Sequence, residues 1–316
     1  MHSALKGISV YPPSKDRTQM NVLEQLDRIT VRIVRLKQGK LTSESGTGFY
    51  FVFAKNADGS GAIAIVTNNH VLAGADSVRI TLHVTDEDGG HRVSTQFAEV
   101  DVALDAVVPH PNPRVDLCAI LISPTLEKLR KASGKHPAPV SLSLDNVASA
   151  KFLDDLLPFE SVRMIGYPVG LWDKTNNAPI VRRGAMATNP QTRYEGRPEF
   201  LIDIAAFPGS SGSPVVVADA GSYGMRNGAL AVGDRFALVG VLWGGPVCKQ
   251  SGEIVEEPVP LTKTVLLPDL NINIGCVSSA SELHILDAAV RTFIADAGRG
   301  KLPPHKSFAD ALGAKR

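Results

Sequence analysis

Cysteine is scarce in this sequence, and the few cysteines follow no pattern that a stabilising or metal-binding framework would need. There are three, Cys118, Cys248 and Cys276, and neither a CxxC pair nor an HExxH motif occurs. An odd number in a chain of this length excludes a disulfide scaffold, and the missing Cys/His spacing argues against a zinc site. Cys118 lies within an apolar run, so we expect it to be a small buried side chain. We expect no metal or other cofactor.

The sequence also lacks a charge imbalance and long apolar runs. Its net charge is +1, which gives no electrostatic reason to expect a nucleic acid or an anionic membrane as a partner. No apolar run reaches the roughly 18 residues that a membrane-spanning helix needs. Residues 1–21 have no apolar segment of the kind found in secretory signals, so the expected location is the cytoplasm. The apolar fraction of 44% and the charged fraction of 21% are those of an ordinary soluble globular protein.

The chain is rich in short β-prone runs separated by turn residues, the pattern of an all-β sandwich or barrel. A first set of strands is expected at residues 29–36, 47–54, 62–67, 78–84, 97–108 and 117–122. A short helix and a proline-containing linker follow it. A second set is expected at 162–166, 180–187, 200–205, 214–218 and 237–243, with 265–274 as a weaker candidate for the last strand.

The end of the chain is expected to be helical. Ser279 and Glu282 have the spacing of a capping box, in which each side chain satisfies a backbone N–H of the first turn. Apolar residues then recur on one helical face up to Gly298, where a glycine cap belongs. We therefore predict a helix over 279–298 and, after it, a flexible basic tail over 299–316.

Three motifs supply a nucleophile, a base and a carboxylate in the chain order His…Asp…Ser. They are residues 67–71 (TNNHV), 115–120 (VDLCAI) and 207–214 (FPGSSGSP). A serine hydroxyl needs a base within hydrogen-bond reach, so His70 is the candidate to take the proton of Ser211. Asp116 would accept a hydrogen bond from the other ring nitrogen and orient the imidazole. This chain order is the one found in serine peptidases of the chymotrypsin type.

The glycines around the serine have their own expected role. Gly209 and Gly212 allow the backbone to turn tightly, so that the N–H groups of Gly209 and Ser211 can converge on a developing oxyanion. The sequence therefore predicts an oxyanion hole built from Gly209 and Ser211. The predicted activity is that of a serine endopeptidase that acts through an acyl-enzyme.

Each of the three motifs alone has a plainer explanation. A Gly/Ser-rich segment between strands is usually a loop, a lone histidine is usually structural, and Asp116 could simply begin a strand. The other histidines lie in the tails, in a strand pattern, beside turns or prolines, or on the terminal helix, namely His2, His83, His91, His110, His136, His284 and His305. Only His70 joins two strand-like segments at the position that the chain order requires.

Together with residues 46–49 (GTGF), these motifs resemble the signature of bacterial trypsin-like (chymotrypsin-fold) serine peptidases, over about residues 29–274. That group includes the high-temperature-requirement proteases and the staphylococcal glutamyl endopeptidases. The resemblance implies two six-stranded antiparallel β-barrels with the active site between them, followed here by the C-terminal helix. We place an N-terminal extension at 1–28, the peptidase domain at 29–298, the first barrel at about 29–122, the linker at about 123–160 and the second barrel at about 161–275.

Within that resemblance, the sequence differs from animal trypsins at positions that set activation and specificity. Ser210 replaces the aspartate that pairs with a freshly cut N-terminus, so activation by that ion pair is not expected. Ala205 stands where trypsin has its acidic specificity residue, which argues against cleavage after Arg or Lys. Trp243 and Gly244 lie in a run that resembles the pocket wall, although Trp243 could also be a core residue. A pocket of Ala205, Trp243 and Gly244 would suit a small or medium apolar side chain of a protein or peptide substrate.

The residues also bear on three alternatives to an unregulated peptidase. An α/β-hydrolase is excluded because it needs G-x-S-x-G with histidine last in the chain, whereas position 213 is Ser213 and His70 comes first. A catalytically silent peptidase-like binding module remains open. An active peptidase could also be held off by a regulatory partner protein that contacts the segment before Ile29 or the loop 166–184. The tail is too short for an appended peptide-binding domain, so a stand-alone peptidase domain is expected.

Overall fold

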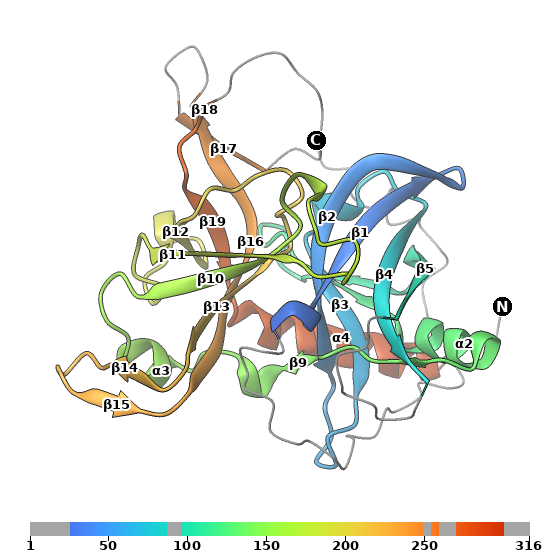
Figure 1. The fold of residues 1–316 in the computed structure, drawn as a ribbon, viewed down its shortest axis with the longest axis horizontal. Helices are drawn as coiled ribbons and strands as arrows, with labels where there is room; N and C mark the ends of the chain where they lie inside the picture. The colour runs from blue at the N-terminus through green and yellow to red at the C-terminus, as the bar shows by residue number, and fades with distance from the viewer. Residues whose placement is uncertain (1–25, 87–95, 249–253, 259–269, 300–316) are drawn as a thin grey trace.

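A computed structural model of the chain describes residues 26–86, 96–248, 254–258 and 270–299. Two largely antiparallel β-sheets lie side by side, and a long C-terminal helix crosses the lower part of the view in Figure 1. Among these residues, no helix is long and apolar enough to cross a membrane. The prediction of an all-β fold with a C-terminal helix is confirmed.

The first sheet is built from the N-terminal part of the chain. Its strands are β1 (Thr30–Lys37), β2 (Lys40–Phe53), β3 (Ala62–Thr67), β4 (Ser77–Thr85), β5 (Phe97–Ala103), β6 (Val107–Pro109) and β7 (Cys118–Leu121), with the short β8 (His136–Pro137) on β4 and β9 (Leu142–Ser143) on β2. The strand order is β5-β4-β1-β2-β3-β7-β6. Buried side chains alternate along β4 and run without a break along β3, as expected of strands that face a core on one side or on both.

One bent segment closes the first sheet on itself. The sequence predicts a single strand over 97–108, but the 3-10 turn η2 (Leu104–Ala106) divides that run into β5 and β6. β5 pairs with β4, and β6 pairs with β7 at the other end of the strand order. The path through the sheet therefore begins and ends on one segment. Because of this bend, the six runs expected from the sequence form a ring.

The second sheet contains a closed barrel. The ring runs through β13 (Pro214–Asp219), β10 (Ser161–Gly166), β11 (Ile180–Met186), β12 (Glu199–Asp203), β19 (Gly275–Ser279) and β16 (Arg235–Cys248), which pairs back with β13. β17 (Ile254–Pro258) and β18 (Leu270–Asn271) pair with β16, and β14 (Ser222–Gly224) and β15 (Leu230–Val232) form a separate hairpin.

The weaker sequence candidate for the last strand of this barrel, 265–274, contains the short β18 but does not close the barrel. The ring closes through β19, which follows that range and pairs with both β12 and β16. Cys276 and Val277 of β19 are fully buried, so this segment supplies the core side chains that the barrel needs. Part of the expected range, 265–269, lies outside the described residues.

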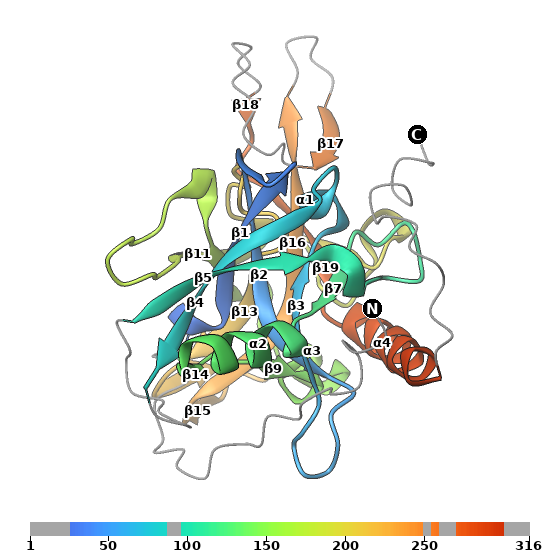
Figure 2. The ribbon, with the colours of Figure 1, turned by 90° about the vertical axis from the view of Figure 1, so that its right-hand side faces the viewer.

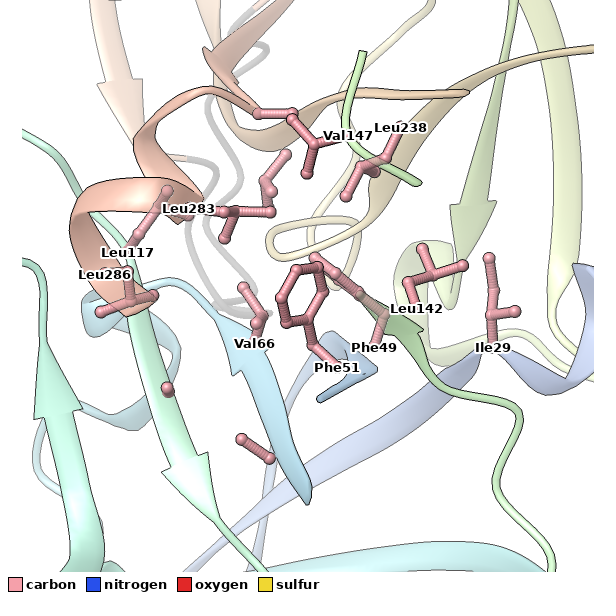
Figure 3. Packing of buried hydrophobic residues seen from close by; sticks show 14 of the residues in the cluster. Ile29, Phe49, Phe51, Val66, Leu117, Leu142, Val147, Leu238, Leu283 and Leu286 are labelled. Carbon is pink, nitrogen blue, oxygen red and sulfur yellow. The ribbon is translucent and has the colours of Figure 1, made fainter. Parts of the chain in front are cut away.

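The described helices are short apart from the last one. They are α1 (Asn69–Leu72), α2 (Ser123–Ser133), α3 (Ala150–Asp154) and α4 (Glu282–Gly298). Leu283 and Leu286 of α4 share one buried cluster with Phe51 of β2 and Leu238 of β16 (Figure 3). Figure 2 shows α4 beside β7. Because each buried leucine contributes about 1.5–3 kcal/mol, α4 stabilises the contact between the two sheets.

The predicted capping box at the start of α4 is wrong. Ser279 ends β19, the helix begins at Glu282, and the preceding Ser281 makes no side-chain cap. The carboxylate of Glu282 instead lies 3.3 Å from Nε2 of His110, and both side chains are buried. Glu282 therefore joins the helix to the first sheet, and this tertiary contact replaces the local one that its spacing predicts.

Candidate active site

His70 lies in α1, the single helical turn that follows β3. Arg35 of β1 holds this turn, because its Nε donates to the carbonyl of Val71 at 2.8 Å and its Nη2 donates to the carbonyl of His70 itself. Glu44 pairs with the same guanidinium at 2.6 Å. Burial lowers the pKa of Arg35, and the Glu44 carboxylate acts in the opposite direction. Sequence reasoning missed Arg35, since nothing distinguishes it from an ordinary charge in a strand.

The structure brings His70 and Asp116 together. Nδ1 of His70 lies 2.5 Å from Oδ2 of Asp116, and the backbone N–H of His70 donates to Oδ1 at 3.3 Å. Asn68 donates from its side chain to the Asp116 carbonyl at 2.6 Å, which fixes the backbone that carries the carboxylate. Nε2 of His70 has no hydrogen-bond partner within the described residues. The Asp116 carboxylate thus contacts His70 at two atoms, the ring Nδ1 and the backbone nitrogen.

The serine turn, residues 207–213, docks on the first sheet. The N–H of Thr47 on β2 donates to the carbonyl of Ser211 at 2.9 Å. Gly212 has φ +88°, and a Cβ there would lie 1.9 Å from the Thr47 carbonyl and 2.6 Å from the Thr67 hydroxyl. Thr67 in turn donates to the Thr47 carbonyl at 2.7 Å. Because Thr67 ends the strand that leads into α1, this docking brings the serine turn to the same region as His70.

The hydroxyl of Ser211 points to the second sheet in this structure. The residue is fully buried, and its Oγ donates to the carbonyl of Trp243 at 3.3 Å. No hydrogen bond joins Ser211 to His70 in the part of the chain that the structure describes. Such bonds are commonly long or poorly aligned in peptidases without substrate and tighten when substrate binds.

Both predicted oxyanion donors are N–H groups that the serine turn leaves unpaired. Within this turn, Ser210, Gly212 and Ser213 donate to the carbonyls of Phe207, Leu242 and Ser210, respectively. The N–H groups of Gly209 and Ser211 have no acceptor among the described residues. The Pro208 carbonyl accepts from Val169 N at 2.5 Å, and Gly209 has φ +87°. Free, fixed donors of this kind can bind an oxyanion.

The predicted pocket residues are placed less directly. Ala205 and Trp243 are buried, and Gly244 lies in β16, where it pairs with Cys276. The carbonyl of Ala205 accepts a hydrogen bond from Arg182, whose guanidinium also lies 5.1 Å from the ring centroid of Phe207. Burial lowers the pKa of Arg182. Sequence reasoning missed Arg182, because a charge within β11 carries no signal of its position beside Ala205.

One cavity lies apart from these residues. It has a volume of about 600 Å³ and is lined by Tyr194, Glu195, Arg197, Leu201, Pro246, Ile272 and Ile274. In the described ranges, no three His, Cys, Asp or Glu side chains gather as metal ligands would. Burial raises the pKa of the Cys118 thiol well above its usual range, and the nearby charge of Asp116 adds to this. Cys118 is therefore the inert buried side chain that the sequence predicts.

Solved structures with a similar overall course include several proteases. The Rv3671c protease of Mycobacterium tuberculosis in its active form is 17% identical, with 88% of this chain and 87% of that chain covered and a TM-score of 0.42. An HtrA-type protease, AlgW with a decapeptide, is 14% identical, with 86% and 67% covered and a TM-score of 0.45. A thermostable serine protease, AL20, is 12% identical, with 84% and 98% covered and a TM-score of 0.43.

Sequence comparison identifies the family. The magnetosome formation protease MamE of Magnetospirillum gryphiswaldense is 31% identical over 180 residues, which are 56% of this chain and 19% of MamE. The chain thus spans about a fifth of the length of this curated relative. The trypsin-like peptidase domain matches residues 46–225, a range that contains His70, Asp116 and Ser211. This protein therefore belongs to the trypsin-like peptidase domain family, as its sequence motifs predict.

Proposed function

We propose that the protein is a serine endopeptidase in which Ser211 is the nucleophile, His70 the general base and Asp116 the residue that orients the base. The observation that carries this proposal is the 2.5 Å contact between His70 Nδ1 and Asp116 Oδ2. A histidine whose Nδ1 bonds to a carboxylate keeps its other ring nitrogen available to accept a proton. The docking of the serine turn through Thr47 supports the role of Ser211 as the nucleophile.

In the proposed reaction, the Ser211 hydroxyl turns from the Trp243 carbonyl towards His70 Nε2. Nε2 takes the hydroxyl proton while Oγ bonds to the carbonyl carbon of the substrate, whose oxygen becomes negatively charged. The N–H groups of Gly209 and Ser211 donate to that oxygen. The imidazolium then gives its proton to the leaving amine as the C–N bond breaks, which leaves an acyl-enzyme.

Water completes the proposed cycle. His70 removes a proton from a water molecule while the water oxygen attacks the acyl carbon. The imidazolium returns this proton to Oγ of Ser211 as the ester bond breaks, and the carboxylic acid product leaves. The negative charge of Asp116 stabilises the imidazolium in both halves of the reaction.

We propose that the substrate is a protein or peptide whose side chain before the cleaved bond enters a pocket formed by Ala205, Trp243 and Gly244. Ala205 and Trp243 are apolar and buried, which supports a preference for a small or medium apolar side chain. The neighbouring Arg182 is bound to the Ala205 carbonyl and to the face of Phe207.

We also propose that a partner protein regulates this activity through the loop 166–184. The observation in favour is the exposure of two apolar side chains, Val169 at 49% and Leu171 at 60%. Single exposed apolar residues are normal on a protein surface. These two, however, belong to the segment whose backbone bonds to Pro208, next to a proposed oxyanion donor.

The test of the proposed function is hydrolysis of unfolded casein by the wild type, Ser211→Ala and Ser210→Ala. The wild type and Ser210→Ala are expected to cleave casein, because the Ser210 side chain has no part in the reaction. Ser211→Ala is expected to be inactive. Cleavage by Ser211→Ala contradicts the proposal, and binding of casein without cleavage by the wild type favours the silent binding module.

A further inference from the structure

The segment that joins β10 to β11, residues 167–178, forms an arch from the second barrel onto the first (Figure 1). The two strands that flank it, β10 and β11, are neighbours in the second sheet. Its side chains nevertheless contact β1 and β4 of the first sheet. These contacts fix the arch relative to both barrels.

The first end of the arch is buried between the barrels. Tyr167 is 1% exposed, and its N–H donates to the hydroxyl of Thr47 at 3.1 Å. Its phenol lies near the side chains of Thr30 and Arg32 on β1. The other end is held by Asn177, which is also buried and donates from its side chain to the Thr81 carbonyl of β4 at 3.3 Å. The ends of the arch are therefore fixed on two strands of the first sheet.

Between its two ends, the arch contacts β1 through Trp172, whose ring faces Arg32. The guanidinium carbon of Arg32 on β1 lies 4.2 Å from the centroid of the Trp172 ring. Among aromatic rings, an indole attracts a cation most strongly, and a guanidinium can stack on its face. The Nε atom of Arg32 is buried without a hydrogen-bond partner among the described residues, so the ring face is the principal partner shown for this group. Lys174 also faces the ring, at 5.1 Å, from the exposed side.

The arch in turn holds the peptide that carries an oxyanion donor. Val169 donates its N–H to the Pro208 carbonyl at 2.5 Å. In a trans peptide the N–H points opposite to the carbonyl, so this bond directs the Gly209 N–H away from the arch. Val169 has φ 45°, an uncommon conformation for a β-branched residue that persists only where surrounding contacts impose it. The oxyanion peptide is thus oriented by a residue that itself depends on the arch.

We infer that Arg32 is a positioning residue for the oxyanion hole, acting through Trp172 and the arch on the Pro208–Gly209 peptide. This inference rests on the proposed function. When the Arg32–Trp172 contact is lost, Val169 is released from its strained conformation and the Pro208 carbonyl loses its donor. The Pro208–Gly209 peptide can then rotate, because glycine accepts both signs of φ, and its N–H leaves the oxyanion hole.

The test compares kcat and KM for casein cleavage in the wild type, Arg32→Ala and Trp172→Ala. An oxyanion donor acts only in the transition state, so kcat should fall while KM stays within about threefold. We expect a loss of about 10- to 100-fold in kcat. This is less than the effect of deleting an oxyanion donor, because the released arch still adopts its original position for part of the time. The matched control is Lys174→Ala, which removes the exposed cation from the same ring and should keep wild-type kcat.

Two further measurements separate positioning from general damage. The double variant of Arg32→Ala with Trp172→Ala should lose no more kcat than either single variant, because both remove one contact. The chain has two tryptophans, so the fluorescence change that Arg32→Ala causes should report the release of Trp172. The same substitution should cause no such change when it is added to Trp172→Ala. Trp172→Ala alters a surface segment outside the core, and it keeps the test valid if Arg32→Ala does not fold.

Wild-type kcat in either single variant, or additive losses in the double variant, overturns the inference. A rise in KM with unchanged kcat overturns it as well, because that pattern reports lost substrate binding. These outcomes leave the proposed function standing. A wild type that neither cleaves casein nor is labelled at Ser211 by a fluorophosphonate removes the proposed function itself.

Discussion

The N–H of Thr47 on β2 donates to the carbonyl of Ser211 at 2.9 Å, and this bond joins the first sheet to the turn of the second that carries the serine. The hydroxyl of Thr47 donates to the Gly209 carbonyl at 2.8 Å and accepts from Tyr167 N at 3.1 Å. One buried residue of the first barrel therefore contacts the serine turn twice and the arch once.

The hydroxyl of Thr47 should be needed for both stability and activity. Thr47→Val keeps the shape of the side chain but leaves the Gly209 carbonyl and the Tyr167 N–H without their partner. A buried group left unpaired costs about 1–3 kcal/mol, so the free energy of unfolding measured with urea should fall by that amount. The value of kcat should fall as well. The control is Thr292→Val on the exposed face of α4, whose hydroxyl bonds only to Ala288. Equal stability of the two variants would contradict this role.

Arg35 should support the position of His70. Arg35→Ala removes two hydrogen bonds to the carbonyls of Val71 and His70, and it leaves Glu44 without its partner. We expect a stability loss of about 1.5–3 kcal/mol, as for hydrogen bonds to a charged group, together with a lower kcat. Arg79→Ala is the control, because that guanidinium pairs with Asp101 on the exposed face of β4. Wild-type kcat in Arg35→Ala would show that α1 holds its position without this contact.

Gly212 should tolerate no side chain. Its φ is +88°, and a Cβ would meet the Thr47 carbonyl at 1.9 Å, so Gly212→Ala must displace the serine turn from β2. Gly74 has a similar φ of +74° with nothing within 4 Å of a Cβ. Gly74→Ala therefore carries only the left-handed strain of about 1–2 kcal/mol. Thermal unfolding should separate the two variants, and a smaller loss at Gly212 than at Gly74 would contradict the docking geometry.

Tyr167 should make the folded state sensitive to alkaline pH. Burial raises the pKa of its phenol from 10.0 to about 12, although the nearby Thr30 hydroxyl and the charge of Arg32 act in the opposite direction. The folded chain therefore keeps a proton that the unfolded chain releases, so stability is complete below pH 10 and falls as pH rises towards about 12. Tyr167→Phe should reduce this fall in urea titrations across that range. Part of the fall should remain, because burial also raises the pKa of Tyr50.

An unchanged pH dependence in Tyr167→Phe would show that the buried phenol does not govern alkaline stability. Lysine and arginine titration affects the wild type and the variant alike. The difference between the two titrations is therefore the quantity to compare.

Much of the fold follows from local sequence patterns. Alternating and continuous apolar runs identify the strands β1 to β4 and the barrel strands β10, β12 and β13, because each buries the face or faces that its pattern predicts. The pairing of His70 with Asp116 also follows from chain order. These features depend on short segments whose residue types restrict the structure strongly.

The features that sequence reasoning missed depend on tertiary contacts. Arg35, Arg182 and Arg32 look like ordinary strand charges, and only the packed structure places them on the carbonyls of His70 and Ala205 or on the ring of Trp172. Glu282 matches a capping pattern but contacts His110 instead, because a buried tertiary partner competes with the local one. Side-chain partners at long sequence separation carry no periodicity from which they could be predicted.

The central claim is that Ser211 is an activated nucleophile, and intact-mass analysis after treatment with a fluorophosphonate tests it most directly. The wild type should gain the mass of one phosphonyl group, and Ser211→Ala should gain none, because only a serine with a working base and oxyanion hole reacts readily. A folded wild-type protein that stays unlabelled, or a Ser211→Ala variant that is labelled as fast as the wild type, would contradict the account.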